Sequence, residues 1–335
     1  MSFSPIIEEV AKKLKCKPED IRFKKDLDGT STARVSEVTW GKDKIGILKQ
    51  NTNKIEWLFY SKIAKNYKVP APSPIAVSTS SDIPWILIEK IYRGIHPKKW
   101  EKNNIERALK ELARFHAQFF NREEEKEFEQ FPKLFTKEWD KTKDKLIKDL
   151  NKAIKIATQY KGKTPVTKTE FEQIKKKIKQ EKFLNDILSV GTTLLHGATW
   201  CYNFMQSAKC SCLLDWKECF FGPPSLEILH FYDLLHFNVE GIKINLRSLP
   251  VTLDGLIKLY LSELKKKNIT IKTSDFKETV KATVPFHFAR QWAPILKPDV
   301  IYLHGGRYFV ARTLRLLPSR KDIRQHYKDL LAYSH

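Results

Sequence analysis

Two neighbouring segments carry most of the information about the fold: residues 193–205 read TLLHGATWCYNFM, and residues 212–227 read CLLDWKECFFGPPSLE. Each segment contains a brief apolar run that is typical of a short buried strand. Asp215 interrupts the second run, and a buried carboxylate is costly unless it has a partner. Asn203 and Asp215 carry hard oxygen atoms of the kind that Mg²⁺ prefers as ligands.

The order and spacing of the polar residues in these segments resemble the aminoglycoside-phosphotransferase and choline-kinase superfamily, and most closely its ecdysteroid-kinase-like small-molecule kinases. Those proteins carry a catalytic loop of the form H-G-D-x-W-x-x-N-x-M, then an acidic metal ligand in a short strand, then a G-P-P turn. The matching positions in this chain are His196, Gly197, Trp200, Asn203, Met205, Asp215 and Gly222-Pro223-Pro224.

The resemblance implies a two-lobed, protein-kinase-like α+β fold with ATP and Mg²⁺ as cofactors. It also implies that Asn203 and Asp215 hold the Mg²⁺ and that a hydroxyl group on a small molecule is phosphorylated. Such chemistry requires the triphosphate charge to be neutralised and the acceptor hydroxyl to be placed in line, and it leaves little covalent work to the protein. The similarity extends over about residues 20–240.

The chain departs from the family pattern at Ala198, where the resemblance would place the catalytic aspartate. An alanine cannot orient a hydroxyl or accept its proton, a role that contributes about 10²–10⁴-fold in rate. Two explanations remain open: a natural pseudokinase that binds nucleotide, or an inactivating Asp-to-Ala substitution in an otherwise competent enzyme. In both cases nucleotide binding is expected to survive better than catalysis.

The N-terminal segment fits the same resemblance. Strand signals recur between residues 21 and 91, and they are interrupted by a helix predicted over residues 53–66. Lys49 ends the third strand and Glu56 lies on that helix, the positions of the phosphate-binding lysine and its glutamate partner in kinase-like folds. The resemblance also assigns nucleotide contacts to a polar hairpin tip and to the end of the fifth strand: Gly29, Thr30, Ser31, Glu89 and Ile91.

These elements predict two domains. Residues 1–92 form a nucleotide-binding lobe with a small antiparallel sheet and one helix, and residues 93–335 form a larger, mainly helical catalytic and substrate-binding lobe. The helical pattern resumes from about residue 104, and the segment 133–190 reads as lysine-rich amphipathic helix.

The composition excludes several classes of protein. The 335 residues include 41% hydrophobic and 12% aromatic residues, which is too much for a disordered chain. No stretch has the roughly 18 apolar residues of a transmembrane helix, and five cysteines are too few for a disulfide framework, so a cytoplasmic protein without a membrane partner is expected. The oligomeric state is not indicated.

The net charge of +22 has three interpretations: a solvated surface, attraction of anionic nucleotide, and nucleic-acid binding. The basic residues are mostly lysines on helices, without interleaved aromatic residues or an arginine-rich motif, which argues against a nucleic-acid partner. The cysteines between residues 201 and 219 lack the spacing of zinc knuckles.

Simpler structural roles compete at several positions. Glu56 could complete a capping box with Asn53, and His116 on an apolar helical face is expected to be a hydrogen-bonded core residue. Trp200 and Met205 are expected to pack rather than bind a ligand.

The acceptor is expected to bind in the helical lobe. An aromatic-lined pocket would suit a lipophilic, steroid-like alcohol or, through a cation cage, an amino alcohol. The alternative is that these aromatic residues are core. The candidate lining residues are Phe286, Phe288, Trp292, Tyr302, Tyr308 and Phe309.

Overall fold

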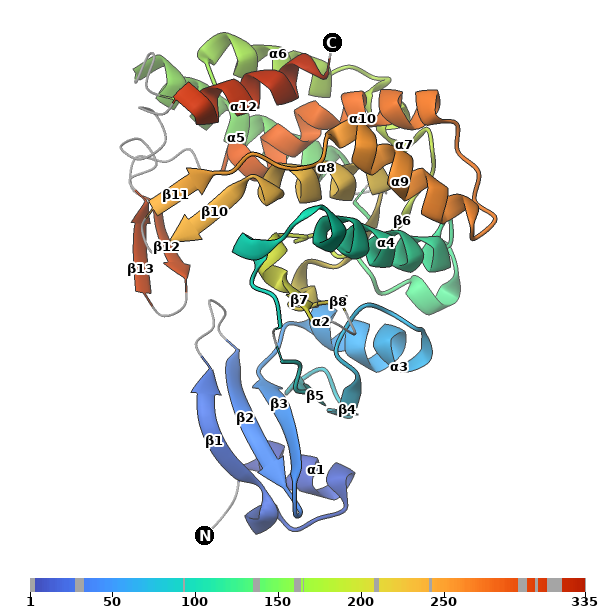
Figure 1. Ribbon diagram of the computed structural model, residues 1–335, viewed down its shortest axis with the longest axis vertical. Helices are drawn as coiled ribbons and strands as arrows, with labels where there is room; N and C mark the ends of the chain where they lie inside the picture. The colour runs from blue at the N-terminus through green and yellow to red at the C-terminus, as the bar shows by residue number, and fades with distance from the viewer. Residues whose placement is uncertain are drawn as a thin grey trace.

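The computed structural model describes most of the chain: residues 4–27, 33–92, 94–134, 139–159, 164, 166–207, 211–240, 243–294, 300–304, 307–311 and 321–334. It has the two-lobed α+β architecture that the sequence predicts, with a small sheet-containing lobe below a larger helical lobe (Figure 1).

The small lobe is built on a five-stranded antiparallel sheet in the order β1-β2-β3-β5-β4. The strands are β1 (Arg22–Leu27), β2 (Arg34–Trp40), β3 (Lys44–Gln50), β4 (Pro74–Val77) and β5 (Trp85–Glu89). Between β3 and β4 the chain forms α2 (Lys54–Leu58), one π-helical turn (Phe59–Ile63) and α3 (Ala64–Asn66). The helix predicted over residues 53–66 is therefore present, with a π turn in its middle.

Alternation along β5 assigns its side chains to the two faces of this sheet. Trp85 and Leu87 belong to a small core with α1 (Pro5–Leu14), whereas Ile86 and Ile88 join the main core of the protein. The Trp85 indole also donates a hydrogen bond of 2.8 Å to Glu9 on α1. The sheet thus packs against α1 on one face and connects to the helical lobe through the other.

The helical lobe has short strand pairs inserted among its helices. Its helices are α4 (Lys102–Phe119), α5 (Trp139–Gln159), α6 (Lys168–Ile178), α7 (Phe183–Leu188), α8 (Pro224–Leu235), α9 (Leu253–Lys265), α10 (Thr273–His287) and α12 (Lys321–Ala332). Its strands pair as β6 (Thr193–Leu195) with β9 (Phe220–Gly222), β7 (Phe204–Gln206) with β8 (Ser211–Leu213), β10 (Phe237–Glu240) with β11 (Lys243–Leu246), and β12 (Val300–His304) with β13 (Arg307–Ala311).

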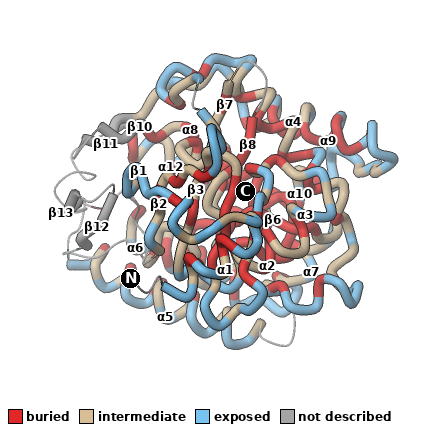
Figure 2. The backbone as a smooth tube through the Cα atoms, turned by 90° about the horizontal axis from the view of Figure 1, so that it is seen from below, coloured by how far each residue is buried: buried red, intermediate tan, exposed pale blue. Residues whose placement is uncertain are grey.

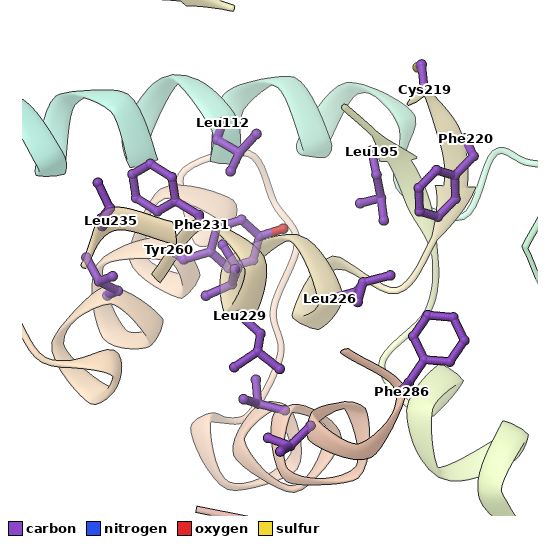
Figure 3. Packing of buried hydrophobic residues seen from close by; sticks show 14 of the residues in the cluster. Leu112, Leu195, Cys219, Phe220, Leu226, Leu229, Phe231, Leu235, Tyr260 and Phe286 are labelled. Carbon is purple, nitrogen blue, oxygen red and sulfur yellow. The ribbon is translucent and has the colours of Figure 1, made fainter. Parts of the chain in front are cut away.

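Helix α8 lies at the centre of this lobe and is buried on nearly every side. Its side chains pack between α4, α9 and α10, as Figure 3 shows for Leu226, Leu229 and Phe231. Exposed segments surround this buried interior (Figure 2). None of the helices within the described ranges is long and apolar enough to cross a membrane.

A buried carboxylate on α8 joins the C-terminal elements to this centre. Asp233 accepts hydrogen bonds from His287 Nε2 at 2.8 Å, Trp292 Nε1 at 2.9 Å and His326 Nε2 at 2.8 Å. Burial opposes ionisation of Asp233, but the hydrogen bonds from His287 and His326 hold its pKa well below the usual range. Since His326 belongs to α12, this carboxylate attaches the last described helix to the core.

Candidate active site

Lys49 and Glu56 form the ion pair that the kinase-like pattern predicts. Lys49 Nζ lies 2.6 Å from Glu56 Oε1 and 2.7 Å from Oε2, and the Thr52 hydroxyl donates to Oε2 at 2.7 Å. The Glu56 side chain is only 3% exposed, so its charge depends on these donors. Asn53 caps α2 through its own side chain, which accepts from the backbone N–H groups of Ile55 and Glu56. One half of the capping box is thus present, whereas the Glu56 carboxylate binds Lys49 and Thr52 and does not complete the other half.

Asp215 lies next to this ion pair, shortly after β8. Its Oδ1 is 3.7 Å from Lys49 Nζ, and its Oδ2 is 3.0 Å from Lys217 Nζ. The residue adopts the left-handed conformation (φ 65°, ψ 62°), which an aspartate tolerates better than most residues. The side chain is 29% exposed, so the expectation of a buried carboxylate is wrong, and two lysines provide the partners that it needs.

The residue after Asp215 connects the two lobes. Trp216 is buried and stacks on Phe59 of the π-helical turn, with ring centroids 3.7 Å apart and ring planes 7° from parallel. This contact fixes the Asp215 turn against the helix that carries Glu56. It accounts for the short distance between groups that are far apart in the sequence.

Asn203 and Ala198 lie on the loop between β6 and β7. The Asn203 side-chain amide donates to the Ala198 carbonyl oxygen at 2.8 Å, which orients Asn203 Oδ1 away from that bond. Leu214 N donates to the Asn203 carbonyl at 2.8 Å, and Phe204 pairs with Leu213 in the β7–β8 hairpin. Asn203 and Asp215 therefore flank the same hairpin end.

This donor set fits a magnesium ion that also binds phosphate oxygens. Mg²⁺ is commonly held by one or two protein oxygen ligands together with substrate phosphates and water. Asn203 Oδ1 and the Asp215 carboxylate are such ligands. Within the described ranges there is no group of three or more His, Cys, Asp or Glu residues that could hold a metal by itself.

Glu227 on α8 holds the backbone of the loop between β6 and β7, a role that the sequence did not reveal. Its carboxylate accepts from His196 N at 2.8 Å, Gly197 N at 2.7 Å and His116 Nε2 at 2.9 Å. Burial raises the pKa of Glu227, but the hydrogen bond and charge of His116 outweigh it, so the pKa lies below the usual range. The Tyr260 hydroxyl lies 2.9 Å from His116 Nδ1, so His116 is a bonded core residue, as expected.

His196 is also a structural residue of this loop. Its Nε2 lies 2.8 Å from the Leu214 carbonyl oxygen and its Nδ1 accepts from Ala198 N at 3.2 Å, which corresponds to the neutral tautomer with Nε2 protonated. Burial lowers the pKa of His196, in agreement with this neutral form. The ring therefore holds Leu214, the neighbour of Asp215, against the loop.

The other residues predicted to contact the nucleotide are those at the end of β5 and at the tip of the first hairpin. Glu89 ends β5, but its backbone N–H donates to Ser73 O at 3.0 Å and its carboxylate accepts from Ser73 N at 2.9 Å, so neither group is free to contact adenine. Ile91 follows β5 in an irregular segment. Gly29, Thr30 and Ser31 lie outside the described residues.

The aromatic residues proposed for an acceptor pocket separate into two groups. Phe286 and Phe288 are fully buried in the main core, and Figure 3 shows Phe286 packed within that cluster, so the pocket interpretation is wrong for these two. Trp292 is partly buried and bonds to Asp233. Tyr302, Tyr308 and Phe309 lie on β12 and β13, whose side chains are outside the described part of the structure.

Comparisons with known proteins agree with this geometry. The model of the ecdysteroid kinase-like family matches residues 87–273, more than half of the chain. The comparison with curated proteins gives no match. Among solved structures, a choline kinase from Cryptosporidium parvum Iowa II superposes with a TM-score of 0.59 at 14% identity, covering 98% of this chain and 97% of that one.

A second solved structure, an amicoumacin kinase in complex with AMP-PNP, Ca²⁺ and its ligand, has a TM-score of 0.50 at 13% identity and covers 96% of this chain and 94% of that one. Identities this low show a shared fold and no more. The family match carries the assignment: this chain belongs to the ecdysteroid kinase-like family.

Proposed function

We propose that this protein binds ATP and Mg²⁺ between its two lobes, residues 1–92 and 93–335, and that its site is built to phosphorylate a hydroxyl group of a small molecule. The observation that carries the proposal is the position of Lys49, which pairs with Glu56 at 2.6 Å and lies 3.7 Å from Asp215. A lysine held in this way provides a fixed charge for phosphate oxygens. The amicoumacin kinase, whose structure contains a nucleotide analogue and a divalent ion, is similar in fold.

Magnesium would be held by Asn203 and Asp215, and it would neutralise charge on the phosphates when bound. Two other residues would hold these ligands in position. Glu227 accepts a hydrogen bond from the loop backbone, and His196 binds the carbonyl oxygen of Leu214, the neighbour of Asp215. A cytoplasmic location without a nucleic-acid partner remains part of the proposal.

Ala198 separates two versions of this function. The residue carries no carboxylate, so the acceptor hydroxyl has no base at the family position, and this sequence is proposed to turn over slowly if at all. If the alanine replaces an aspartate, the rest of the site is in place for catalysis. If it is the natural residue, the protein is a pseudokinase that binds nucleotide without transferring phosphate.

For the acceptor, we propose an uncharged lipophilic alcohol in preference to an amino alcohol, because the net charge of +22 disfavours a cationic ligand. The Arg290 guanidinium lies 4.7 Å from the centroid of the Phe220 ring, and the same ring lies so close to Gly197 that a Cβ at that position would be 3.0 Å from its Cε1 atom. The carboxylates of Glu218 and Glu227 also act on this guanidinium. The charge of Arg290 by itself therefore does not select between the two acceptor classes.

The test restores the missing carboxylate. We would compare the Ala198→Asp and Ala198→Asn variants, which have side chains of similar size but differ in basicity, in an assay of ADP release with steroid alcohols and with choline and ethanolamine as acceptors. The proposal expects Ala198→Asp to exceed Ala198→Asn by about 10²-fold or more with at least one alcohol.

Other results would contradict parts of the proposal. If Ala198→Asp binds Mg-ATP and phosphorylates none of the alcohols, the pseudokinase version is favoured. If neither variant binds ATP, the kinase proposal is wrong. Preference for choline over every uncharged alcohol would overturn the acceptor class.

A further inference from the structure

Asp215 is paired with a second lysine that the family pattern does not predict. Lys217 Nζ lies 3.0 Å from Asp215 Oδ2, closer than Lys49 Nζ is to Oδ1. The two residues begin a single 3-10 turn, and the stacked Trp216 between them fixes its orientation. Both carboxylate oxygens of the proposed metal ligand therefore have an ammonium group near them.

The charges around Asp215 make this arrangement unusual for a metal site. The charge of Lys49 is already matched by Glu56, whereas Asp215 is the one carboxylate within ion-pair distance of Lys217 in the described structure. Ala198 adds no negative charge. The four charged groups Lys49, Glu56, Asp215 and Lys217 therefore sum to zero, and a carboxylate at position 198 would have made the sum negative.

Both members of the additional pair are accessible to a ligand. The side chains of Asp215 and Lys217 are each 29% exposed, so the ammonium group is neither buried nor fully hydrated. An ammonium of this kind can donate to phosphate oxygens through charge-assisted hydrogen bonds. A divalent cation that approaches Asp215 Oδ2 must instead displace it.

We infer that Lys217 serves as a built-in cation at Asp215, so that the site keeps substantial affinity for a nucleoside triphosphate when no divalent cation is present. The inference rests on the proposed function, because it requires nucleotide to bind at Asp215. It assigns Lys217 as a phosphate-binding residue and as a competitor of the metal for Asp215. Magnesium then strengthens binding without being required for it.

The experiment measures binding of the non-hydrolysable analogue AMP-PNP to the full chain by isothermal titration calorimetry, once with excess MgCl₂ and once with excess EDTA. Lys217→Met removes the charge but keeps an unbranched stem, and Lys217→Arg keeps the charge. The matched control is Lys277→Met, because Lys277 is also 29% exposed and also pairs with one aspartate, Asp254 at 2.6 Å.

The inference predicts that the wild-type protein, Lys217→Arg and Lys277→Met bind AMP-PNP in EDTA, and that Lys217→Met binds at least about tenfold more weakly there. It also predicts that Lys217→Met gains more from added Mg²⁺ than the wild-type protein does. A thermal-unfolding scan of each variant verifies folding.

Two results would overturn the inference, and they are distinguishable. If wild-type protein and Lys217→Met both bind AMP-PNP with the same dependence on Mg²⁺, Lys217 has no such role while the proposed function stands. If no variant, wild-type included, binds AMP-PNP in either condition, the proposed function fails as well.

Discussion

The carboxylate of Glu227 accepts the backbone N–H groups of His196 and Gly197, at 2.8 and 2.7 Å, and so ties helix α8 to the loop that contains Ala198. This carboxylate is buried and accepts three hydrogen bonds, two of them from the loop backbone.

Replacing Glu227 with Gln should destabilise the protein by about 2–4 kcal/mol, since three hydrogen bonds to a charged acceptor become weaker or lose their match. Chemical denaturation measures the free energy of unfolding. Titration with AMP-PNP measures the nucleotide affinity, which reports whether the loop is still in place. Glu263→Gln, which alters another buried carboxylate that pairs with Lys266, is the control: it should lower stability without lowering nucleotide affinity. Equal effects of both variants on affinity would argue against a special role for Glu227.

Gly197 should tolerate no side chain. Its φ is +82°, and a Cβ there would clash with the Glu218 carbonyl oxygen. Gly197→Ala is expected to cost more than about 3 kcal/mol, whereas Gly41→Ala, at φ +61° with nothing within 4 Å, should cost only about 1 kcal/mol. The comparison separates steric clash from backbone conformation; unfolding free energies that agree within error would contradict this account of the loop.

Stability should fall as the pH decreases from about 6.5 to about 4. Burial, followed by the charge of His326, lowers the pKa of His236 from 6.5 to about 4, and burial also lowers the pKa of His230. In this window the unfolded chain binds protons that the folded chain excludes, so the free energy of unfolding decreases on acidification. The stability contributed by the neutral histidines is complete above pH 6.5.

His236→Asn should reduce that slope by up to about 1.4 kcal/mol per pH unit, the contribution of one proton, while leaving the contribution of His230. Urea denaturation at several pH values between 4 and 7 measures the slope. An unchanged slope in the variant would show that His236 is already protonated in the folded protein.

Removing the lysine of the Lys49–Glu56 pair should lower the free energy of unfolding. Lys49→Met leaves a carboxylate that is 3% exposed with Thr52 as its remaining side-chain donor, for a loss of about 3 kcal/mol. The double variant Lys49→Met/Glu56→Gln should recover part of this loss, because the buried charge is then removed. Thermal and urea unfolding of Lys49→Met, Glu56→Gln and the double variant test the coupling. If the losses of unfolding free energy in the two single variants add up to the loss in the double variant, the two residues are not coupled and the prediction is contradicted.

The parts of this site that could be predicted from the sequence are those whose residues lie close together in the chain or at recognised spacings. Lys49, Glu56, Asn203 and Asp215 belong to this group, and the structure brings Lys49, Glu56 and Asp215 together. The helical period after β3 also lies in local sequence, so the helix was predicted over residues 53–66, close to its observed extent.

The long-range partners could not be predicted in this way. Glu227 and Asp233 each stand in the apolar run of α8, where an acidic residue signals a buried hydrogen-bonded centre. The donors to Glu227, however, come from α4 and the loop after β6, and those to Asp233 come from α10, the π turn after it and α12. For Phe286 and Phe288 the sequence left both a pocket and a core position open, because residue type alone does not distinguish a core face from a pocket wall, and the structure places both in the core. The sequence does not distinguish Lys217 from the many other lysines, because only its distance of 3.0 Å from Asp215 Oδ2 sets it apart.

The most direct test of the central claim is the affinity of AMP-PNP with Mg²⁺ for the wild-type protein and for Lys49→Met, measured by isothermal titration calorimetry. The account predicts one saturable site in the wild-type protein and binding at least about tenfold weaker in Lys49→Met, which loses a charge-assisted contact to phosphate. Failure of the folded wild-type protein to bind, or equal affinity in the two proteins, would contradict a nucleotide site at Lys49, Glu56 and Asp215.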